Sequence, residues 1–149
     1  MATDPAEPPS SDATVDFIDL LVQTSFEVIA VVTRVGAEHD LSLTLVRMLG
    51  ILRDRTLTMA ELADYLGLER STVTGLVDRA ERRELVSRRA SSVDGRSVQL
   101  SLSAKGKALT DTASVALSAR LAPVVEKVPA DIRDALPAAL RQLQISARG

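Results

Sequence analysis

The sequence predicts a mainly α-helical chain with a small β-wing, arranged as a winged helix-turn-helix with dimerisation helices at both ends. Three observations predict this fold class. Apolar residues recur at three- and four-residue steps over most of the 149 residues, as amphipathic helices require. Two short helical patterns, at 59–66 and 70–83, are separated by a glycine. An alternating apolar and polar run at 97–102 then predicts a half-buried strand.

Shifts in composition divide the chain. Residues 1–13 are rich in Pro, Ser and acidic side chains, which predicts a disordered tail. Residues 14–40 and 104–146 are predicted to form a helical dimerisation region, and residues 42–102 the winged helix-turn-helix. The first helix has a broader apolar face than a monomeric surface helix needs, which favours burial against a partner chain. A helix in the centre of the chain's own core is the alternative. This face consists of Val15, Ile18, Leu21, Val22, Phe26, Ile29 and Val32.

Capping signals mark the first helix of the helix-turn-helix. Thr58 followed three residues later by Glu61 is a capping box, in which each side chain accepts from the other residue's free backbone N–H. Gly67 stands where a left-handed residue would end this helix. A shorter helix through Leu52 is predicted to precede it and to start at Ser42 or Thr44.

The second helix, over 70–83, presents a polar face that suits a DNA major groove. Its apolar residues share the opposite face at helical spacing. Short hydroxyl side chains and a long cation stand at its start, and residues at this end are the ones that reach base edges. Polar residues that only face solvent are the alternative. The outward set is Ser71, Thr72, Thr74, Gly75, Asp78, Arg79 and Arg82, and the inward set is Val73, Leu76, Val77 and Ala80.

A hairpin follows the second helix. Strands are predicted over 85–89 and 97–102, joined by a turn, with Val98, Leu100 and Leu102 facing inward. Arg96 is predicted to lie at the tip, where it can enter a minor groove. Asp94 is close enough in sequence to orient it through a charge-assisted bond. A solvated ion pair at the tip, which would contribute little, is the alternative.

From Leu62 to Gly106 the chain resembles the MarR family of bacterial transcriptional regulators. The matching segments are ELADYLG, STVTGLVDRAERRELVSR, DGR and LSAKGKAL. The resemblance implies a homodimer on a pseudo-palindromic operator, usually a repressor and often released by a small molecule. It also implies that Ser71, Thr72 and Thr74 lie in the major groove and that Asp94 holds Arg96 in the minor groove.

Three positions depart from the family pattern. Gly75 stands where many members carry a long, often basic side chain, and it costs about 1 kcal/mol of helix stability relative to Ala. Glu84 stands where a Gly usually ends the second helix, which predicts a strained backbone or a different ending. Ala80 replaces a larger apolar residue and predicts a thinner contact to the core.

The charge distribution favours nucleic acid more than the net charge does. The whole chain carries −2, and its pI is near 5.4. Between residues 70 and 96, however, the sequence contains seven arginines and four acidic residues, which gives a local charge of about +3. The predicted DNA-binding residues are Arg70, Ser71, Thr72, Thr74, Gly75, Arg79, Arg88, Asp94 and Arg96.

Three prolines organise the C-terminal helices. Ser103 is predicted to cap a helix over 104–128, in which Pro123 should produce a kink or a split. Pro129 suits the first turn of a last helix, and Pro137 predicts a bend within it. The leucine stripes of these helices are predicted to pair with the first helix of a partner chain.

Other function classes have little support in the sequence. The chain has no cysteine and one histidine, His39, so thiolate chemistry is excluded and a metal site is not expected. No Gly-rich phosphate loop or catalytic constellation is found, so neither an enzyme nor a cofactor is predicted. No signal peptide or apolar run long enough for a membrane is found, which predicts a cytoplasmic protein without a membrane partner.

Two questions stay open at this level. A winged helix used only for protein–protein contact, without DNA binding, is the alternative function, although the basic wing argues against it. A small-molecule effector follows from the resemblance alone, with the junction between the helical region and the winged helix as its expected site. Phe26, Met48 and Met59 are the candidate lining residues, and each is also readable as plain core.

Overall fold

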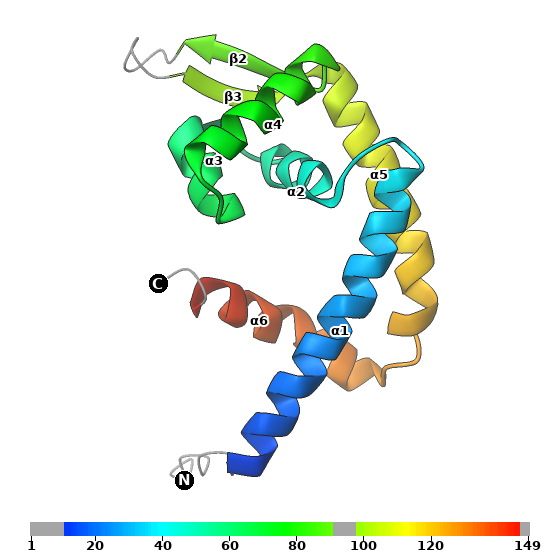
Figure 1. Cartoon of the computed structure of the whole chain (residues 1–149). Coiled ribbons are helices and arrows are strands. Elements are labelled where there is room, and N and C mark those ends of the chain that lie inside the picture. The colour runs from blue at the N-terminus through cyan, green and yellow to red at the C-terminus, as the bar shows by residue number, and fades with distance from the viewer. Residues whose placement is uncertain (1–10, 91–97, 147–149) are drawn as a thin grey trace, which may run out of the picture.

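The computed structural model describes residues 11–90 and 98–146 (Figure 1). It confirms the predicted fold class, with a winged helix-turn-helix and long flanking helices. The elements are α1 (Ser11–Ala37), α2 (Leu43–Leu52), β1 (Leu57–Thr58), α3 (Met59–Leu66), α4 (Arg70–Arg82), β2 (Val86–Ala90), β3 (Val98–Leu102), α5 (Ala104–Val125) and α6 (Ala130–Ser146). We call the part from Ser42 to Leu102 the winged helix, and α1, α5 and α6 the arm.

The winged helix has a hydrophobic core of its own. α3 packs against both α2 and α4, and all three helices pack against the sheet. Fully burying one large apolar side chain stabilises a fold by about 1.5–3 kcal/mol. The fully buried side chains of the winged helix are Met48, Leu52, Leu62, Val73, Val77, Leu85 and Leu100.

The predicted caps of α2 and α3 are present. The Ser42 hydroxyl accepts from the Leu45 backbone N–H at 3.3 Å. The Glu61 carboxylate accepts from the Thr58 backbone N–H at 2.7 Å, and the Thr58 hydroxyl accepts from the Glu61 N–H at 3.3 Å. The first of these two bonds is the main reason that the pKa of the Glu61 carboxyl is lowered. Gly67 ends α3 with a left-handed φ of 66°.

The sheet differs from the predicted two-stranded ribbon. It has three antiparallel strands in the order β1-β3-β2, because β1 pairs with β3 at Leu57↔Leu100 and Thr58↔Gln99. β1 ends at this register, so it does not extend beside the outer part of β3. Val98 is accordingly 44% exposed, and the prediction that it faces the core is wrong, whereas Leu100 is completely buried.

The end of α4 has the strained backbone that the sequence predicted. Glu84 adopts a left-handed φ of 60°, which is unusual for a residue with a side chain. The Leu85 N–H donates to the Ala80 carbonyl at 2.9 Å, a bond typical of a left-handed helix ending. The helix therefore turns sharply into β2.

The first turn of α5 is built against this corner. The Ser103 hydroxyl donates to the Glu84 carbonyl and accepts from the Gly106 N–H at 2.9 Å. Lys105 forms an ion pair with the Glu84 carboxylate at 3.0 Å. A Cβ on Gly106 would lie 1.9 Å from the Leu85 carbonyl oxygen, so only glycine permits this approach. The family segment LSAKG thus joins the winged helix to the arm.

The boundaries of the arm helices differ in detail from the predictions. α1 begins at Ser11, so residues 11–13 are helical rather than part of a tail, and residues 1–10 lie outside the described part. α5 passes through Pro123 and ends at Val125, so the predicted continuation to 128 is wrong. Pro129 directly precedes α6 instead of lying in its first turn, and its carbonyl accepts from the Arg133 N–H at 2.9 Å.

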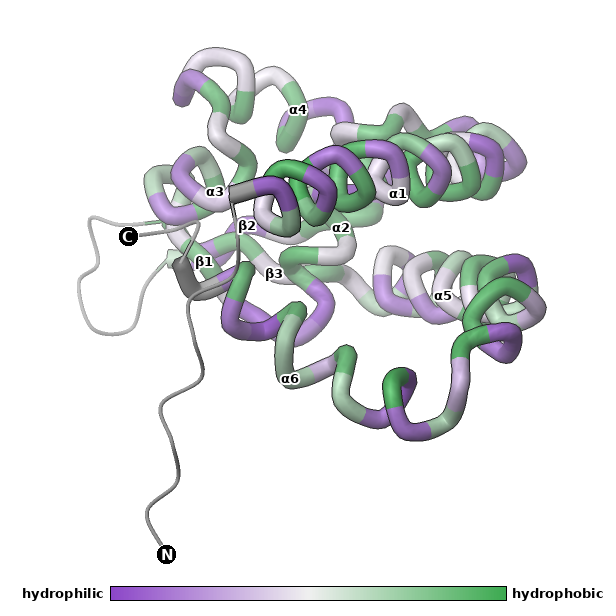
Figure 2. The backbone as a smooth tube through the Cα atoms, turned by 90° about the horizontal axis from the view of Figure 1, so that it is seen from below, coloured by the Kyte–Doolittle hydropathy of each residue, from purple (hydrophilic) through white to green (hydrophobic). Residues whose placement is uncertain are grey.

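The arm leaves long apolar surfaces uncovered. The C-terminal end of α1 lies beside α5, whereas the N-terminal half of α1 extends away from the winged helix (Figure 1). In the same view, α6 lies below the winged helix. Hydrophobic positions recur along α1 and α6 in Figure 2. The exposed side chains on these two helices include Leu20 at 62%, Phe26 at 66% and Ile132 at 50%. Over the ranges 11–90 and 98–146, no helix combines the length and apolarity needed to cross a membrane.

Candidate nucleic-acid interface

α4 presents its predicted polar face to solvent because its other face is held in the core. Its four inward residues, which include Val73 and Ala80, are each at most 4% exposed. The helix is therefore fixed in rotation about its axis, and the residues between them must point outward. The exposed side chains are Ser71, Thr72, Thr74, Arg79, Glu81 and Arg82.

The three hydroxyl side chains of this face are not equivalent. The Thr74 hydroxyl donates to the Arg70 carbonyl at 2.8 Å, so its hydrogen is already used within the helix. Its methyl group and lone pairs remain available. Ser71 and Thr72 make no side-chain hydrogen bond within the described part of the chain, and both can donate to bases or phosphates.

The arginines around α4 divide into two groups. In the first group the side chain has neither a hydrogen bond nor an ion pair to any residue in 11–90 or 98–146, and each residue is exposed. Guanidinium groups in this state can form bidentate bonds to phosphate or guanine. The group consists of Arg70, Arg79, Arg82 and Arg89. Arg83 and Arg88 form the second group, and their guanidinium groups are already bonded.

Arg88 connects β2 to α4 through ion pairs. Its guanidinium pairs with Asp78, and its Nε lies 3.3 Å from a Glu81 carboxylate oxygen. Both acidic residues belong to α4, and Arg88 belongs to β2. The sequence predicted Arg88 as a DNA-binding residue, and the structure gives it this contact as well. The two carboxylates are also occupied, so they leave the neighbouring arginines unpaired.

Arg83 ties the end of α4 to the loop between α1 and α2. Its guanidinium donates to the Asp40 carbonyl at 2.7 Å and to the His39 carbonyl at 3.0 Å. Asp40 has a left-handed φ of 55°, and this bond helps to hold the unusual backbone. Sequence reasoning missed the contact because the acceptors are main-chain atoms more than 40 residues away.

The remaining predicted site residues lie in three different places. Asp94 and Arg96 are outside the described residues. Met48 is completely buried, and Met59 packs against the same core. Phe26 lies on the arm, outside that core. The structure therefore does not join the three proposed effector-lining residues into one cavity among those described below.

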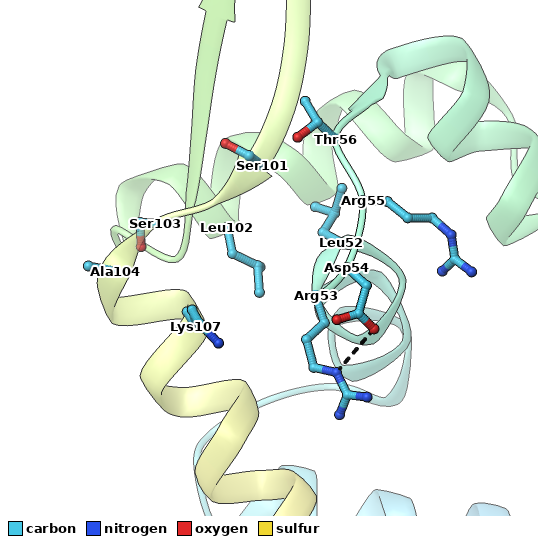
Figure 3. Close-up of a pocket in the computed structure, with 10 residues that line it drawn as sticks. All are labelled: Leu52, Arg53, Asp54, Arg55, Thr56, Ser101, Leu102, Ser103, Ala104 and Lys107. Atoms are coloured by element: carbon cyan, nitrogen blue, oxygen red, sulfur yellow. Dashed lines mark hydrogen bonds and ion pairs between the residues drawn. The ribbon is translucent and has the colours of Figure 1, made fainter.

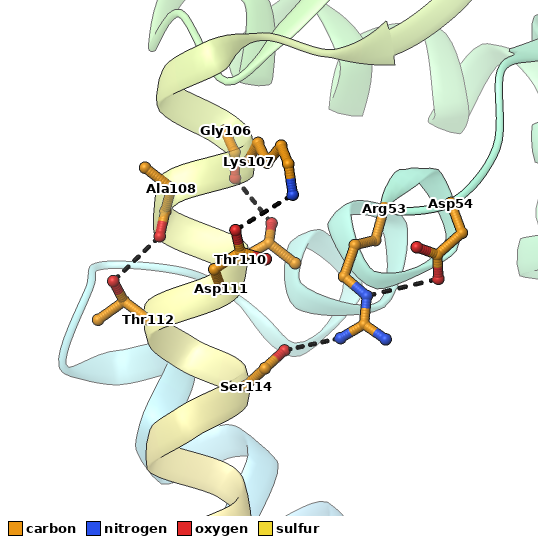
Figure 4. A network of polar contacts seen from close by, with 9 residues as sticks. All are labelled: Arg53, Asp54, Gly106, Lys107, Ala108, Thr110, Asp111, Thr112 and Ser114. Atoms are coloured by element: carbon orange, nitrogen blue, oxygen red, sulfur yellow. Dashed lines mark hydrogen bonds and ion pairs between the residues drawn. The ribbon is translucent and has the colours of Figure 1, made fainter.

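One open hollow of about 340 Å³ lies where the end of α2 meets the first turn of α5 (Figure 3). Arg53 in this hollow donates to the Ser114 hydroxyl at 3.0 Å and pairs with Asp54 at 3.5 Å (Figure 4). Lys107 pairs with Asp111 at 3.2 Å. These cations are neutralised locally, and the bond from Arg53 to Ser114 connects the end of α2 to α5.

A second hollow, of about 490 Å³, lies at the junction of the arm with α4. It is lined by the α1–α2 loop, the end of α4 and the first turns of α5, including His39, Arg83 and Lys105. A gap of only about 70 Å³ lies between α2 and α5, below the usual size of a ligand pocket. In the described ranges, no cluster of His, Asp or Glu side chains could hold a metal ion.

Residues 39–97, which run from the loop after α1 to the residue before β3, match the sequence model of the MarR family. The match covers 59 of the 149 residues, so this segment is similar to the MarR family. The matched segment includes α4, the corner at Glu84 and β2. No curated protein sequence matches the chain.

Solved structures extend the likeness beyond this segment to the arm. NadR in complex with 4-hydroxyphenylacetate is 22% identical with a TM-score of 0.73, and the match covers 96% of this chain and 97% of NadR. CouR from Rhodococcus jostii RHA1, bound to p-coumaroyl-CoA, is 23% identical with a TM-score of 0.74, covering 90% and 95%. A Staphylococcus aureus MepR mutant bound to an oligodeoxyribonucleotide is 20% identical with a TM-score of 0.61, covering 88% and 97%. At these identities the likeness shows a shared fold.

Proposed function

We propose that this chain is a sequence-specific regulator that binds double-stranded DNA as a homodimer on a pseudo-palindromic operator and represses transcription. The observation that carries the proposal is the outward face of α4. Hydroxyl side chains stand at the start of this face, and Arg79 and Arg82 on it have no partner in the described part of the chain. The opposite face is fixed in a rigid core, as a reading helix requires.

The apolar surface of the arm supports the homodimer. Side chains such as Phe26 and Leu20 are mostly exposed in the single chain, and contiguous apolar patches of this kind mark interaction surfaces. A second copy of the chain, related to the first by a two-fold axis, would cover these apolar side chains on both chains. Two recognition helices about 10 bp apart would then meet the two halves of an inverted repeat. Because its operator is chromosomal DNA, the proposal places the protein in the cytoplasm.

Release by a small-molecule effector completes the proposal. We assign it to the hollow beside Arg83, whose guanidinium is bonded to main-chain carbonyls and not to a carboxylate, so that its positive charge favours an anionic group. A ligand there would contact both the end of α4 and the arm, and so alter the spacing of the two recognition helices. NadR and CouR, whose structures contain 4-hydroxyphenylacetate and p-coumaroyl-CoA, support an organic acid or its thioester as the ligand class.

Selection from a random duplex pool, followed by fluorescence anisotropy at several salt concentrations, tests this function. We expect enrichment of an inverted repeat and an affinity that falls steeply as salt rises. Arg82→Ala should reduce the salt slope by about 1, whereas Arg53→Ala, which removes a locally neutralised cation, should leave it unchanged. Thr72→Ala should instead relax discrimination at particular base pairs.

Failure to select any duplex, together with salt-insensitive binding, would contradict the proposal. The measurement is repeated after denaturation and refolding, which removes any copurified effector. If binding is still absent, the winged helix serves a protein partner instead of DNA.

A further inference from the structure

Gly75 occupies the middle of the outward face of α4 without a structural reason within the chain. Its φ is not left-handed, since Gly67 is the only glycine in the described residues with a positive φ. A Cβ added to Gly75 would meet one neighbouring atom, the Nη1 of Arg79 at 3.6 Å, which is an ordinary van der Waals distance. By contrast, a Cβ on Gly106 would collide with a main-chain carbonyl.

A glycine in a helix interior destabilises the helix relative to alanine, because the unfolded chain has more freedom to lose. Gly75 lies well inside α4, which runs from Arg70 to Arg82. The isolated chain would therefore be more stable with another residue at this position. A molecule that contacts the outward face of α4 would supply the reason for a glycine at this position.

Arg79 is the residue that uses the space above Gly75. It stands four residues later, and long side chains in a helix point back toward the N-terminus over the preceding turn. Its guanidinium accordingly lies beside the Gly75 Cα. The carboxylates of Asp78 and Glu81 are bonded to Arg88, and within the described ranges Arg79 has no ion pair or side-chain hydrogen bond. None of its five N–H donors is used within these ranges.

We propose that Gly75 and Arg79 form one specificity-determining pair. Because Gly75 has no side chain, the space beside it is open to the Arg79 guanidinium. From this position the guanidinium donates two hydrogen bonds to O6 and N7 of a guanine in each half-site. Arg is the side chain best matched to this pair of acceptors in the major groove. The glycine also lets the helix backbone approach the base edges closely. This inference rests on the proposed DNA-binding function.

Base-pair scanning of the selected operator tests the pair. Each G·C pair of the half-site is replaced by A·T, and the affinities of the wild-type chain, Gly75→Gln and Arg79→Ala are compared. For the wild-type chain, one replacement per half-site should weaken binding by about 5- to 150-fold. For Gly75→Gln and Arg79→Ala, that same replacement should change the affinity less than about twofold, and the double variant should lose no more than either single one.

Matched variants separate this effect from folding. Gly50, in α2, is another helical glycine, and a Cβ there would meet nothing within 4 Å. Both Gly50→Ala and Gly75→Ala should raise the Tm by about 2–4 °C. Only the variants at Gly75 should lose discrimination, with Ala losing less than Gln. Arg82→Ala should weaken binding to all duplexes equally.

The outcomes distinguish this pair from the function on which it rests. If the wild-type chain binds its operator and Gly75→Gln still discriminates at every G·C pair, the inference about Gly75 and Arg79 is wrong and the proposed function stands. Additive losses in the double variant would also overturn it. If the wild-type chain selects no duplex at all, the proposed function itself fails.

Discussion

The winged helix and the arm differ in how much of their apolar surface the chain buries by itself. In the winged helix, Met48, Leu62 and Leu100 are completely buried, together with the rest of a continuous core. In the arm, Phe26 and Ile132 are at least half exposed, and no residue of α6 with a described side chain is buried. The comparison teaches that the winged helix can be stabilised by its own core, whereas the arm requires a second surface.

The largest expected effect is on the arm. Phe26→Glu would place an unpaired carboxylate in the surface that we assign to the dimer, and it should weaken self-association on the order of a thousandfold, or roughly 4 kcal/mol. Light scattering after size-exclusion chromatography measures this. Val98→Glu is the matched control, because Val98 is a similarly exposed apolar residue of the wing. It should remain a dimer, and dissociation of both variants would contradict the division of roles.

The next effect concerns the core of the winged helix. Leu100→Ala should lower the free energy of unfolding by about 3 kcal/mol, since it leaves a cavity at a fully buried position. Val98→Ala, two residues earlier on β3, should lower it by less than about 1 kcal/mol because Val98 is already exposed. Urea denaturation measures the free energy of unfolding of both variants. Equal losses would mean that the outer part of β3 is covered in solution.

A smaller effect is expected where the two regions meet. Arg83→Gln removes the hydrogen bonds to the His39 and Asp40 carbonyls and should lower the free energy of unfolding by about 1–2 kcal/mol. Arg82→Gln, at the neighbouring exposed position, should change it by less than about 0.5 kcal/mol. Urea denaturation compares the two. If the two variants are equally stable, the bonds from Arg83 do not connect α4 to the arm.

The smallest effect depends on pH. The pKa of Glu61 is lowered in the folded chain, so its carboxylate stabilises α3 fully above the pKa that it has when unfolded. This contribution is lost as the pH falls through the folded pKa. Glu61→Gln should therefore have a lower Tm than wild type at pH 7 and an equal one in strong acid, where both side chains are neutral. A Tm difference that persisted in strong acid would contradict this role of the carboxylate.

Local signals were enough to predict the winged helix. The capping box at Thr58 and Glu61 and the left-handed Gly67 are both set by neighbours within a few residues, and both are present. The two faces of α4 followed from its helical period. The strain at Glu84 was visible because a residue with a side chain occupies a position that usually requires glycine.

Contacts between distant residues could not be predicted in this way. β1 has two residues, too few for an alternating pattern, and exists because β3 pairs with it. The bonds that occupy Arg83 and Arg88 depend on how the elements pack, so a count of arginines could not separate these two from the unpaired ones. The separation of Phe26 from Met48 also follows only from the placement of α1.

Sedimentation equilibrium of the chain, alone and with its selected operator duplex, tests the central claim most directly. We predict that the free chain sediments at twice its 15.9 kDa and that each duplex binds two chains. Complexes with one chain should not be detected, because the arm joins the two winged helices before either binds. A free chain at 15.9 kDa that binds the duplex one copy at a time would contradict this account of the arm.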